Sequence, residues 1–218
     1  MKHLLEVDSV QLEFNNRKIL SDVYLKVMTG DIIGLLGRNG QGKTSLFQII
    51  HGVLNCDKSV RVDKINQPQL FRNPEILRFL PQYHFIPTSL SPKRIFSDFN
   101  LDFSTFENKF KEFKSKLNSK FITLSGGEKR IIEIYIIVKS KSYFSILDEP
   151  FTQLNPLQIE KIKELILEEK ENKGFIISDH KYEDVLEVSN TIYVLTSGKI
   201  HSVSNINEIE SLGYLNLK

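Results

Sequence analysis

The stretch "GDIIGLLGRNGQGKTSLFQIIHGVL" constrains the fold of this chain more than any other. It runs from a short apolar strand through a glycine-rich loop into an amphipathic helix. The loop, Gly37–Thr44, fits G-x-x-x-x-G-K-[ST] between that strand and that helix, the context that the pattern requires. Its glycines let consecutive N–H groups face an anion, and the helix adds its positive end. A wholly apolar strand belongs in a sheet covered on both faces, so the sequence predicts an α/β core that binds phosphate.

Two side chains of this loop have distinct expected roles. Lys43 is placed to reach the terminal phosphates, and Thr44 to put its hydroxyl on Mg²⁺. The alternative, a glycine-rich turn with an incidental lysine, is disfavoured because strand, loop and helix follow one another directly. The residues expected to bind the nucleotide here are Gly37, Arg38, Asn39, Gly40, Gln41, Gly42, Lys43, Thr44 and Ser45.

An acidic pair, Asp148 and Glu149, closes the apolar strand "YFSIL". Both side chains are therefore expected at the carboxyl edge of the sheet, where parallel α/β folds bind ligands. Asp148 is suited to hold the Mg²⁺ shell opposite Thr44, while Glu149 can polarise a water aligned with the γ-phosphate. The alternative is a solvated acidic turn before Pro150, which the four apolar residues running into the pair disfavour.

Three other patterns outline the rest of the chain. "VDSVQLEF", the turn "NNRK" and "ILSDVYLKV" predict an antiparallel hairpin. "SYFSILDEP" and "GFIISDH" predict two strands joined by the helical pattern "NPLQIEKIKELILEEKEN", which stops at Gly174, as in a β-α-β crossover. Between Gln82 and Leu124, aromatic residues at 3,4 spacing predict a small helical lobe, with Ser104 and Glu107 available as a capping box. The spaced residues are Phe103, Phe106, Phe110, Phe113 and Leu117.

Composition narrows the class without naming a partner. The 218 residues carry 29 Lys and Arg against 27 Asp and Glu, a net charge of +2 that does not favour nucleic acid or an anionic membrane. The single cysteine, Cys56, cannot form an internal disulfide, so a reducing compartment is expected. Glu6 and Asp8 interrupt the opening, and no signal peptide is expected. The apolar stretches fall short of the ~20 residues that a spanning helix needs, so a separate subunit must supply any spans.

A second glycine-led helix start lies in "TLSGGEKR", Thr123–Arg130. Two glycines expose backbone N–H groups ahead of an apolar-periodic run, an arrangement suited to an anion. The same residues also describe an ordinary capped helix, with Ser125 as N-cap and Glu128 as its capping-box mate. The two interpretations are compatible.

Five motifs in order resemble the ATP-binding cassette (ABC) family, the ATPase subunits of ABC transporters. They are "GRNGQGKT", the glutamine of "LPQYHF", "LSGGEKR", "ILDEP" and the histidine of "ISDH", and they span nearly the whole chain. The resemblance implies one ABC ATPase domain over residues 1–218. Its P-loop NTPase (RecA-like) core would carry an N-terminal antiparallel β subdomain and a helical subdomain at about 83–135. The insert is too short for the coiled coils of DNA-repair relatives.

The resemblance also implies partners and cofactors. In this family two cassettes pack head to tail around two ATP molecules with Mg²⁺. Ser125, Gly126 and Gly127 of one would then bind the γ-phosphate held by the other. The expected partner is an identical chain or a second ABC ATPase subunit, together with a transmembrane permease, and no nucleic acid. The expected location is cytoplasmic, at the inner face of the membrane.

Three further roles carry over from the family, each with a plain alternative. Gln82 resembles the glutamine that links Mg²⁺ and the attacking water to the lobe, although a glutamine after proline is often a loop residue. His180 resembles the switch histidine that contacts the γ-phosphate, although a lone histidine is often structural. Phe14 lies where the family stacks an aromatic ring on adenine, but it also extends an apolar strand face. The expected catalytic set is Lys43, Gln82, Glu149 and His180, and the expected metal set is Thr44, Gln82 and Asp148.

The chain departs from the family pattern after the acidic pair. Phe151 replaces the usual threonine, and Asn155 replaces the aspartate of Leu-Asp-Pro. An amide keeps hydrogen bonds but not charge, so coupling between the two sites could differ. This feature keeps a second function open, a soluble ATP-gated clamp that is not coupled to transport. The aromatic loop "QYHFIPTSL" resembles the segment that receives a helix of the membrane subunit, and the alternative is that it packs the lobe.

Overall fold

The computed structural model describes residues 2–212 and opens on an antiparallel sheet. β1 (Leu4–Phe14) pairs with β2 (Arg17–Met28) in the predicted hairpin, but the turn is shorter than the predicted "NNRK", because Arg17 and Lys18 already belong to β2. Both turn residues, Asn15 and Asn16, have positive φ (49° and 62°), the backbone that a tight hairpin turn of type I′ requires. β4 (Asp57–Val62) and β5 (Ile65–Asn66) complete the strand order β2-β1-β4-β5.

A second sheet of six strands forms the centre, in the order β10-β9-β3-β8-β7-β6. The five strands from β9 to β6 run parallel to one another, and the edge strand β10 is antiparallel to β9. Every residue of β3, β7 and β8 is buried, which confirms that these apolar runs lie in a covered sheet. The bounds are β3 Ile32–Leu36, β6 Leu77–Leu80, β7 Phe144–Asp148, β8 Gly174–Ser178, β9 Thr191–Thr196 and β10 Lys199–Val203.

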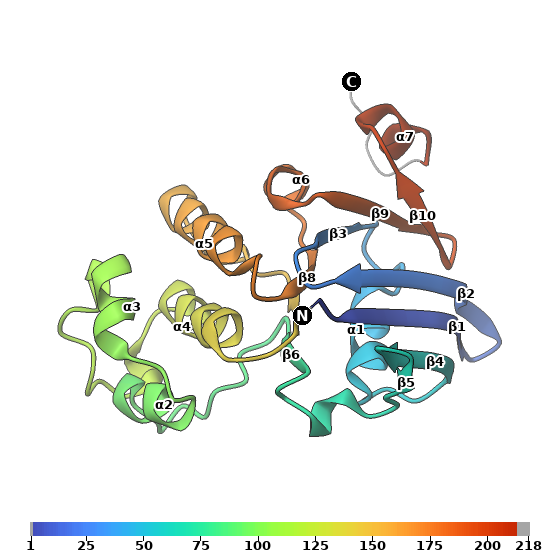
Figure 1. Cartoon of the computed structure of the whole chain (residues 1–218). Helices are drawn as coiled ribbons and strands as arrows, with labels where there is room; N and C mark the ends of the chain where they lie inside the picture. The colour runs from blue at the N-terminus through green and yellow to red at the C-terminus, as the bar shows by residue number, and fades with distance from the viewer. Residues whose placement is uncertain (1, 213–218) are drawn as a thin grey trace.

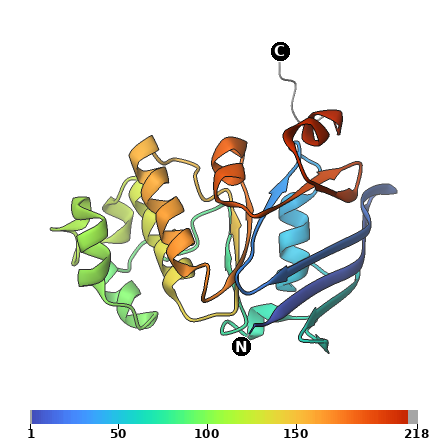
Figure 2. The same ribbon diagram turned by 45° about the horizontal axis from the view of Figure 1, so that its top comes forward.

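Helices cover both faces of this central sheet. α1 (Lys43–His51) shares one apolar cluster with β1, β2, β3 and β7, so it is packed between the two sheets. The other cluster holds α4 (Gly126–Lys139), α5 (Pro156–Glu169) and α6 (Tyr182–Val188) with the lobe. Figures 1 and 2 show α2 (Pro92–Asp98) and α3 (Phe103–Lys109) far from the β1–β2 hairpin, and α7 (Ile206–Ser211) close to β10. The α/β core with its antiparallel β part is confirmed.

The helical lobe differs from its prediction in detail. The helix beginning near Phe103 ends at Lys109, and a 3-10 turn follows at Lys111–Phe113, so the predicted helix through Leu117 is wrong. The N-cap is Asp102, whose carboxylate accepts the first N–H groups, and the proposed Ser104 capping box is absent. The aromatic spacing still marks the core, because Phe106, Phe110 and Phe113 are all fully buried. Further 3-10 turns lie at Leu70–Arg72 and Phe121–Thr123.

Two boundaries are also refined. α5 ends at Glu169, and four residues separate it from the start of β8 at Gly174, so the helix ends earlier than predicted. α4 continues to Lys139, beyond residue 135, where the helical subdomain was expected to end. The bounds of that subdomain, about 83–135, stay a prediction. In residues 2–212, no helix combines the length and apolarity needed to cross a membrane.

Candidate functional site

The phosphate loop has the backbone that its glycines permit. Gly40 and Gly42 have φ of 76° and 103°, in the left-handed region that other residues rarely adopt. Gly42 is the N-cap of α1 and has no side chain to accept the first N–H groups of that helix, so these donors are available to an anion. Lys43 Nζ donates to the carbonyl oxygens of Gly37 (2.5 Å) and Arg38 (3.2 Å), which keeps the ammonium inside the curve of the loop.

Contacts behind the loop fix its position. A Cβ added to Gly37 would lie 2.6 Å from the carbonyl oxygen of Leu195 on β9. The Gln41 side chain turns toward the β9–β10 turn, where its Oε1 accepts the N–H of Ser197 at 3.1 Å. Gln41 was predicted to bind the nucleotide. In the structure its side chain instead connects the phosphate loop to the β9–β10 turn.

The metal corner lies where β7 ends. Asp148 is 1% exposed, and its carboxylate is hydrogen-bonded by the Thr44 side chain. Burial raises the pKa of Asp148 to about 6, against the bond from Thr44. In the described part of the chain its Oδ2 atom is buried without a partner. An orphaned carboxylate oxygen beside a hydroxyl is a ligand set that Mg²⁺ accepts, so these residues fit the ion.

The catalytic corner is one residue further. Glu149 has a φ of 52°, which turns its side chain out of the strand line, and its N–H donates to the Ser178 carbonyl at 2.7 Å. Its Oε1 lies 2.7 Å from His180 Nε2, and its Oε2 accepts the Thr152 hydroxyl at 3.4 Å. β7 and β8 therefore deliver Glu149 and His180 to the same point.

A cavity of about 390 Å³ gathers most of the predicted site residues. It joins the hairpin, the phosphate loop, the loop after β6 and the ends of β7 and β8. The lining residues are Phe14, Ile19, Asn39, Gly40, Gly42, Lys43, Thr44, Ser45, Gln82, Asp148, Glu149 and His180. Outside this lining lie Gly37, Arg38, Gln41, Ser125, Gly126 and Gly127, and Ile19 was not predicted.

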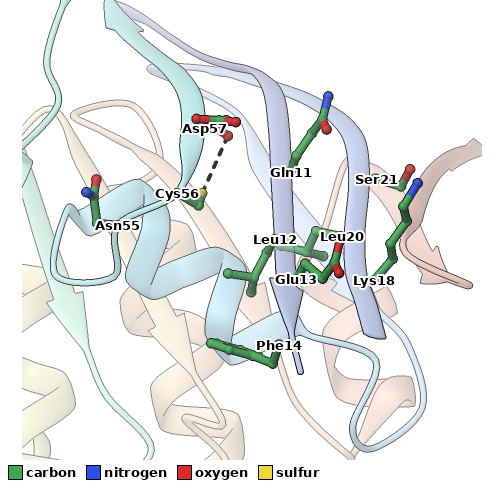
Figure 3. Close-up of a pocket in the computed structure, with 10 residues that line it drawn as sticks. All are labelled: Gln11, Leu12, Glu13, Phe14, Lys18, Leu20, Ser21, Asn55, Cys56 and Asp57. Atoms are coloured by element: carbon green, nitrogen blue, oxygen red, sulfur yellow. Dashed lines mark hydrogen bonds between the residues drawn. The ribbon is translucent and has the colours of Figure 1, made fainter. Parts of the chain in front are cut away.

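Phe14 was expected either to stack on adenine or to extend the apolar face of its strand, and its exposure bears on this choice. Val10 and Leu12 are buried, but Phe14 is 48% exposed, so the buried face of the strand ends before it. Phe14 lines both the nucleotide cavity and a second one of about 480 Å³, which Figure 3 shows beside β1 and the start of β4. A half-exposed ring at the edge of the cavity is suited to stacking on a base.

The second helix start is built as a capped helix, as predicted. Ser125 Oγ accepts the Glu128 N–H, and Glu128 accepts the Ser125 N–H at 2.9 Å, a reciprocal capping box. Neither bond uses Gly126 or Gly127. These glycines have a packing reason as well, since a Cβ at Gly127 would lie 2.7 Å from the carbonyl oxygen of Gln153. Ser125 is exposed.

Asn155, the departure noted in the sequence, is the N-cap of α5. Its Oδ1 accepts the Gln158 N–H at 2.9 Å, and Gln158 Oε1 accepts the Asn155 N–H at 3.2 Å. Asparagine and aspartate are comparable N-caps, so the replacement keeps the start of the helix while removing a charge.

Comparison with known proteins decides the family. The model of the ABC transporter family matches residues 20–152. The chain belongs to this family. A lipopolysaccharide export system ATP-binding protein, LptB, of Haemophilus influenzae is 30% identical and covers 90% of this chain and 88% of its own. LptB of Acidithiobacillus ferridurans is 28% identical, with 96% and 93% covered.

The fold of this ABC protein agrees with solved structures. An ATP-binding subunit of an ABC transporter superposes with a TM-score of 0.80 at 22% identity, covering 97% of this chain and 94% of that one. The chain is an ATPase of the transporter type, an ATP-binding subunit, as its motifs predicted.

Two charged residues of this ABC ATPase escaped the sequence analysis. Arg130 and Glu133 lie on α4, are 2% and 0% exposed, and reach the loop that carries Gln82. The available signal was two opposite charges three residues apart, at the start of and within an apolar helical run, which is typical of a buried ion pair.

Proposed function

We propose that this ATPase works as a dimer that encloses two Mg·ATP, with an identical chain or a second ABC ATPase subunit. One observation carries the proposal. At the Ser125–Gly127 helix start, Ser125 is exposed and both glycines are partly exposed, and all three lie outside the nucleotide cavity of their own chain, although their N–H groups and the hydroxyl suit an anion. In a head-to-tail pair, this helix start would cover the γ-phosphate that the partner's phosphate loop leaves open.

In each cavity, different residues would bind the metal ion, the phosphates and the adenine. The Thr44 hydroxyl and the Asp148 carboxylate would hold Mg²⁺, with the Gln82 side chain completing the corner. When bound, the ion neutralises charge on the β- and γ-phosphates. The outward N–H groups of α1 and the Lys43 ammonium bind the phosphates, and Phe14 stacks on adenine.

Glu149 is the group placed to act on water. Its carboxylate faces the cavity beside His180, close to where the γ-phosphate would lie. A carboxylate at this point orients the attacking water and accepts its proton. His180, which is half exposed, is held by Glu149 and contacts the γ-phosphate. Closure of the dimer excludes bulk water from this point.

The loop after Gln82 offers a surface for a membrane permease. Tyr83 is 68% exposed, whereas Ile86 is 6% exposed and packs into the lobe. One aromatic side chain therefore projects while the next apolar residues hold the loop in place. We propose that Tyr83 contacts a permease subunit at the cytoplasmic face of the membrane.

ATP-driven dimerisation of a Glu149→Gln variant tests the proposal. The substitution keeps the shape of the side chain but removes its basicity, so ATP stays bound and the closed dimer accumulates. Light scattering after gel filtration should show a dimer with Mg·ATP and a monomer without it. Adding Ser125→Arg, which fills the helix start, should return the protein to a monomer. A strict monomer of Glu149→Gln at saturating Mg·ATP would contradict the proposal.

A further inference from the structure

Arg130 ties two separate backbone segments to α4 through three carbonyl groups. It follows Ser125 by five residues, and its guanidinium is almost fully buried. Its Nη1 donates to the carbonyl of Pro81 at 2.7 Å, and its Nη2 donates to the carbonyls of Asp148 (2.5 Å) and Glu149 (2.9 Å). One side chain thus joins the second helix start, the residue before Gln82 and the end of β7.

Glu133 holds the same loop on its other side. Its Oε1 accepts the N–H of Phe85 at 3.0 Å, and its Oε2 lies 2.9 Å from His84 Nδ1. The same oxygen lies 3.8 Å from Arg130 Nη1, so the two buried charges compensate each other. Gln82 and Tyr83 are therefore held between two anchors on a single turn of α4.

The backbone conformation of Glu149 depends in part on the bond from Arg130. Its φ of 52° is unfavourable for a residue with a side chain and persists only where the surroundings fix it. The contacts that fix it include the bond from the Glu149 N–H to the Ser178 carbonyl, and the bonds that the Glu149 carbonyl accepts from Arg130 (2.9 Å) and from the Thr152 N–H (3.4 Å). Removing the guanidinium would release Pro81 and one side of the Glu149 turn together.

We propose that Arg130 and Glu133 are positioning residues that hold the Gln82 side chain and the Glu149 carboxylate in one geometry. They make the Pro81–Phe85 loop and the end of β7 a unit with α4, so a push on Tyr83 is transmitted to the catalytic carboxylate. The inference rests on the roles proposed above for Gln82 and Glu149. Neither Arg130 nor Glu133 lines the nucleotide cavity, so the expected defect is in turnover and not in ATP affinity.

Steady-state kinetics separate positioning from binding. A catalytic group displaced by about 1 Å can cost roughly 100-fold in rate, so Arg130→Met should lower kcat by about that factor with the Kd for ATP unchanged. Glu133→Gln should lower kcat less, because one acceptor remains. Lys139→Met is the matched control, since it removes another α4 ion pair, to Glu169, that does not touch the loop, and should keep the parent kcat.

A spectroscopic readout tests the anchoring directly. The chain contains no tryptophan, so Tyr83→Trp introduces a single indole on the anchored loop. In that background Arg130→Met should lower the steady-state fluorescence anisotropy of the indole, while Lys139→Met should not. The double variant Arg130→Met/Glu133→Leu removes both charges, which avoids a lone buried charge if the single variant unfolds. It should give the same low anisotropy.

Two results would overturn the inference. One is a parent-like kcat in folded Arg130→Met. The other is an indole as immobile in Arg130→Met and in the double variant as in the Tyr83→Trp parent. Failure of the proposed function is distinguishable, because it would appear as normal hydrolysis by Glu149→Gln, and the anisotropy comparison does not depend on hydrolysis.

Discussion

The starts of α1 and α4 are both led by glycine, yet they are prepared differently for an anion. At α1 the N-cap Gly42 makes no side-chain bond, the first turn has no acidic residue, and Lys43 lies within the loop. At α4 the N-cap is Ser125, whose side chain already accepts the Glu128 N–H, and the acidic residue Glu128 lies in the first turn. The first helix start offers free N–H donors and the Lys43 ammonium. At the second, the Ser125 N–H and hydroxyl already bond Glu128.

Titration of the nearby acids sharpens this difference. Burial raises the pKa of Asp148 to about 6 at the first site. At the second site burial also acts against the charge of Glu128, but bonds from Lys116 and from the Ser125 N–H outweigh it and lower the pKa of that carboxyl. Glu128 already accepts the Ser125 N–H, and Lys116 is paired with Glu128, so the second helix start offers a lone phosphate fewer free donors than the first. The second site should therefore bind only a phosphate already held by another chain, which is the asymmetry that the dimer proposal needs.

Removing the cation should break the first site and produce the largest effect. Lys43→Met deletes a charge-assisted contact worth about 1.5–3 kcal/mol, so ATP affinity of the monomer should fall roughly 10- to 150-fold. Isothermal calorimetry on the monomer measures it. Ser125→Asn serves as the matched change at the second helix start and should leave monomer affinity at the parent value. Equal losses in both variants would show that the two starts are not different in kind.

Lowering the pH should weaken the first site through its acid. Mg²⁺ needs the ionised carboxylate, so Mg-dependent ATP affinity should fall roughly tenfold between pH 7 and pH 5, because the pKa of Asp148 is about 6. The folded pKa lies above the usual 3.8, so ionisation opposes folding above pH 6 and this group adds stability as the pH falls from 6 toward 3.8. Equilibrium binding and urea unfolding across this range measure the two trends. Asp148→Asn should abolish both, and an unchanged pH profile in that variant would count against the assignment.

The cap of the second helix start should give the smallest effect. Ser125→Ala removes the acceptor of the Glu128 N–H and should lower the free energy of unfolding by about 1 kcal/mol. Ser125→Asn keeps an N-cap acceptor and should unfold like the parent, yet its larger side chain should impair the ATP-driven dimer of Glu149→Gln. Urea denaturation and light scattering separate the two roles. If Ser125→Asn dimerises normally, the helix start has only its capping role.

Sequence reasoning succeeded where a local pattern carries its own physical cause. The phosphate loop needs only glycines between a strand and a helix, and the capping box of α4 needs only Ser125 and Glu128. It failed at the lobe helix, because Asp102 outcompeted Ser104 for the first N–H groups and the chain left the helix after Lys109. The aromatic spacing identified buried rings correctly without fixing their secondary structure.

Asn155 and Gln153 show what local patterns leave out. Asn155 was noticed as a lost charge, but its bonds with Gln158 make it a helix cap. Gln153 gave no signal, although its carbonyl is what excludes a side chain at Gly127. Arg130 was even part of a quoted motif, yet its role depends on carbonyl groups distant in sequence.

By itself the sequence determined the ABC family, the apolar strands that lead into the phosphate loop and the acidic pair, and the chemical types at the cavity, because each follows from residues adjacent in the chain. Only the tertiary structure decided that Arg130 and Glu133 link the loop of Gln82 to the backbone at the end of β7, next to the side chain of Glu149. Hydrogen bonds to backbone carbonyls depend on where segments meet in space, and no side-chain pattern records which carbonyls those are.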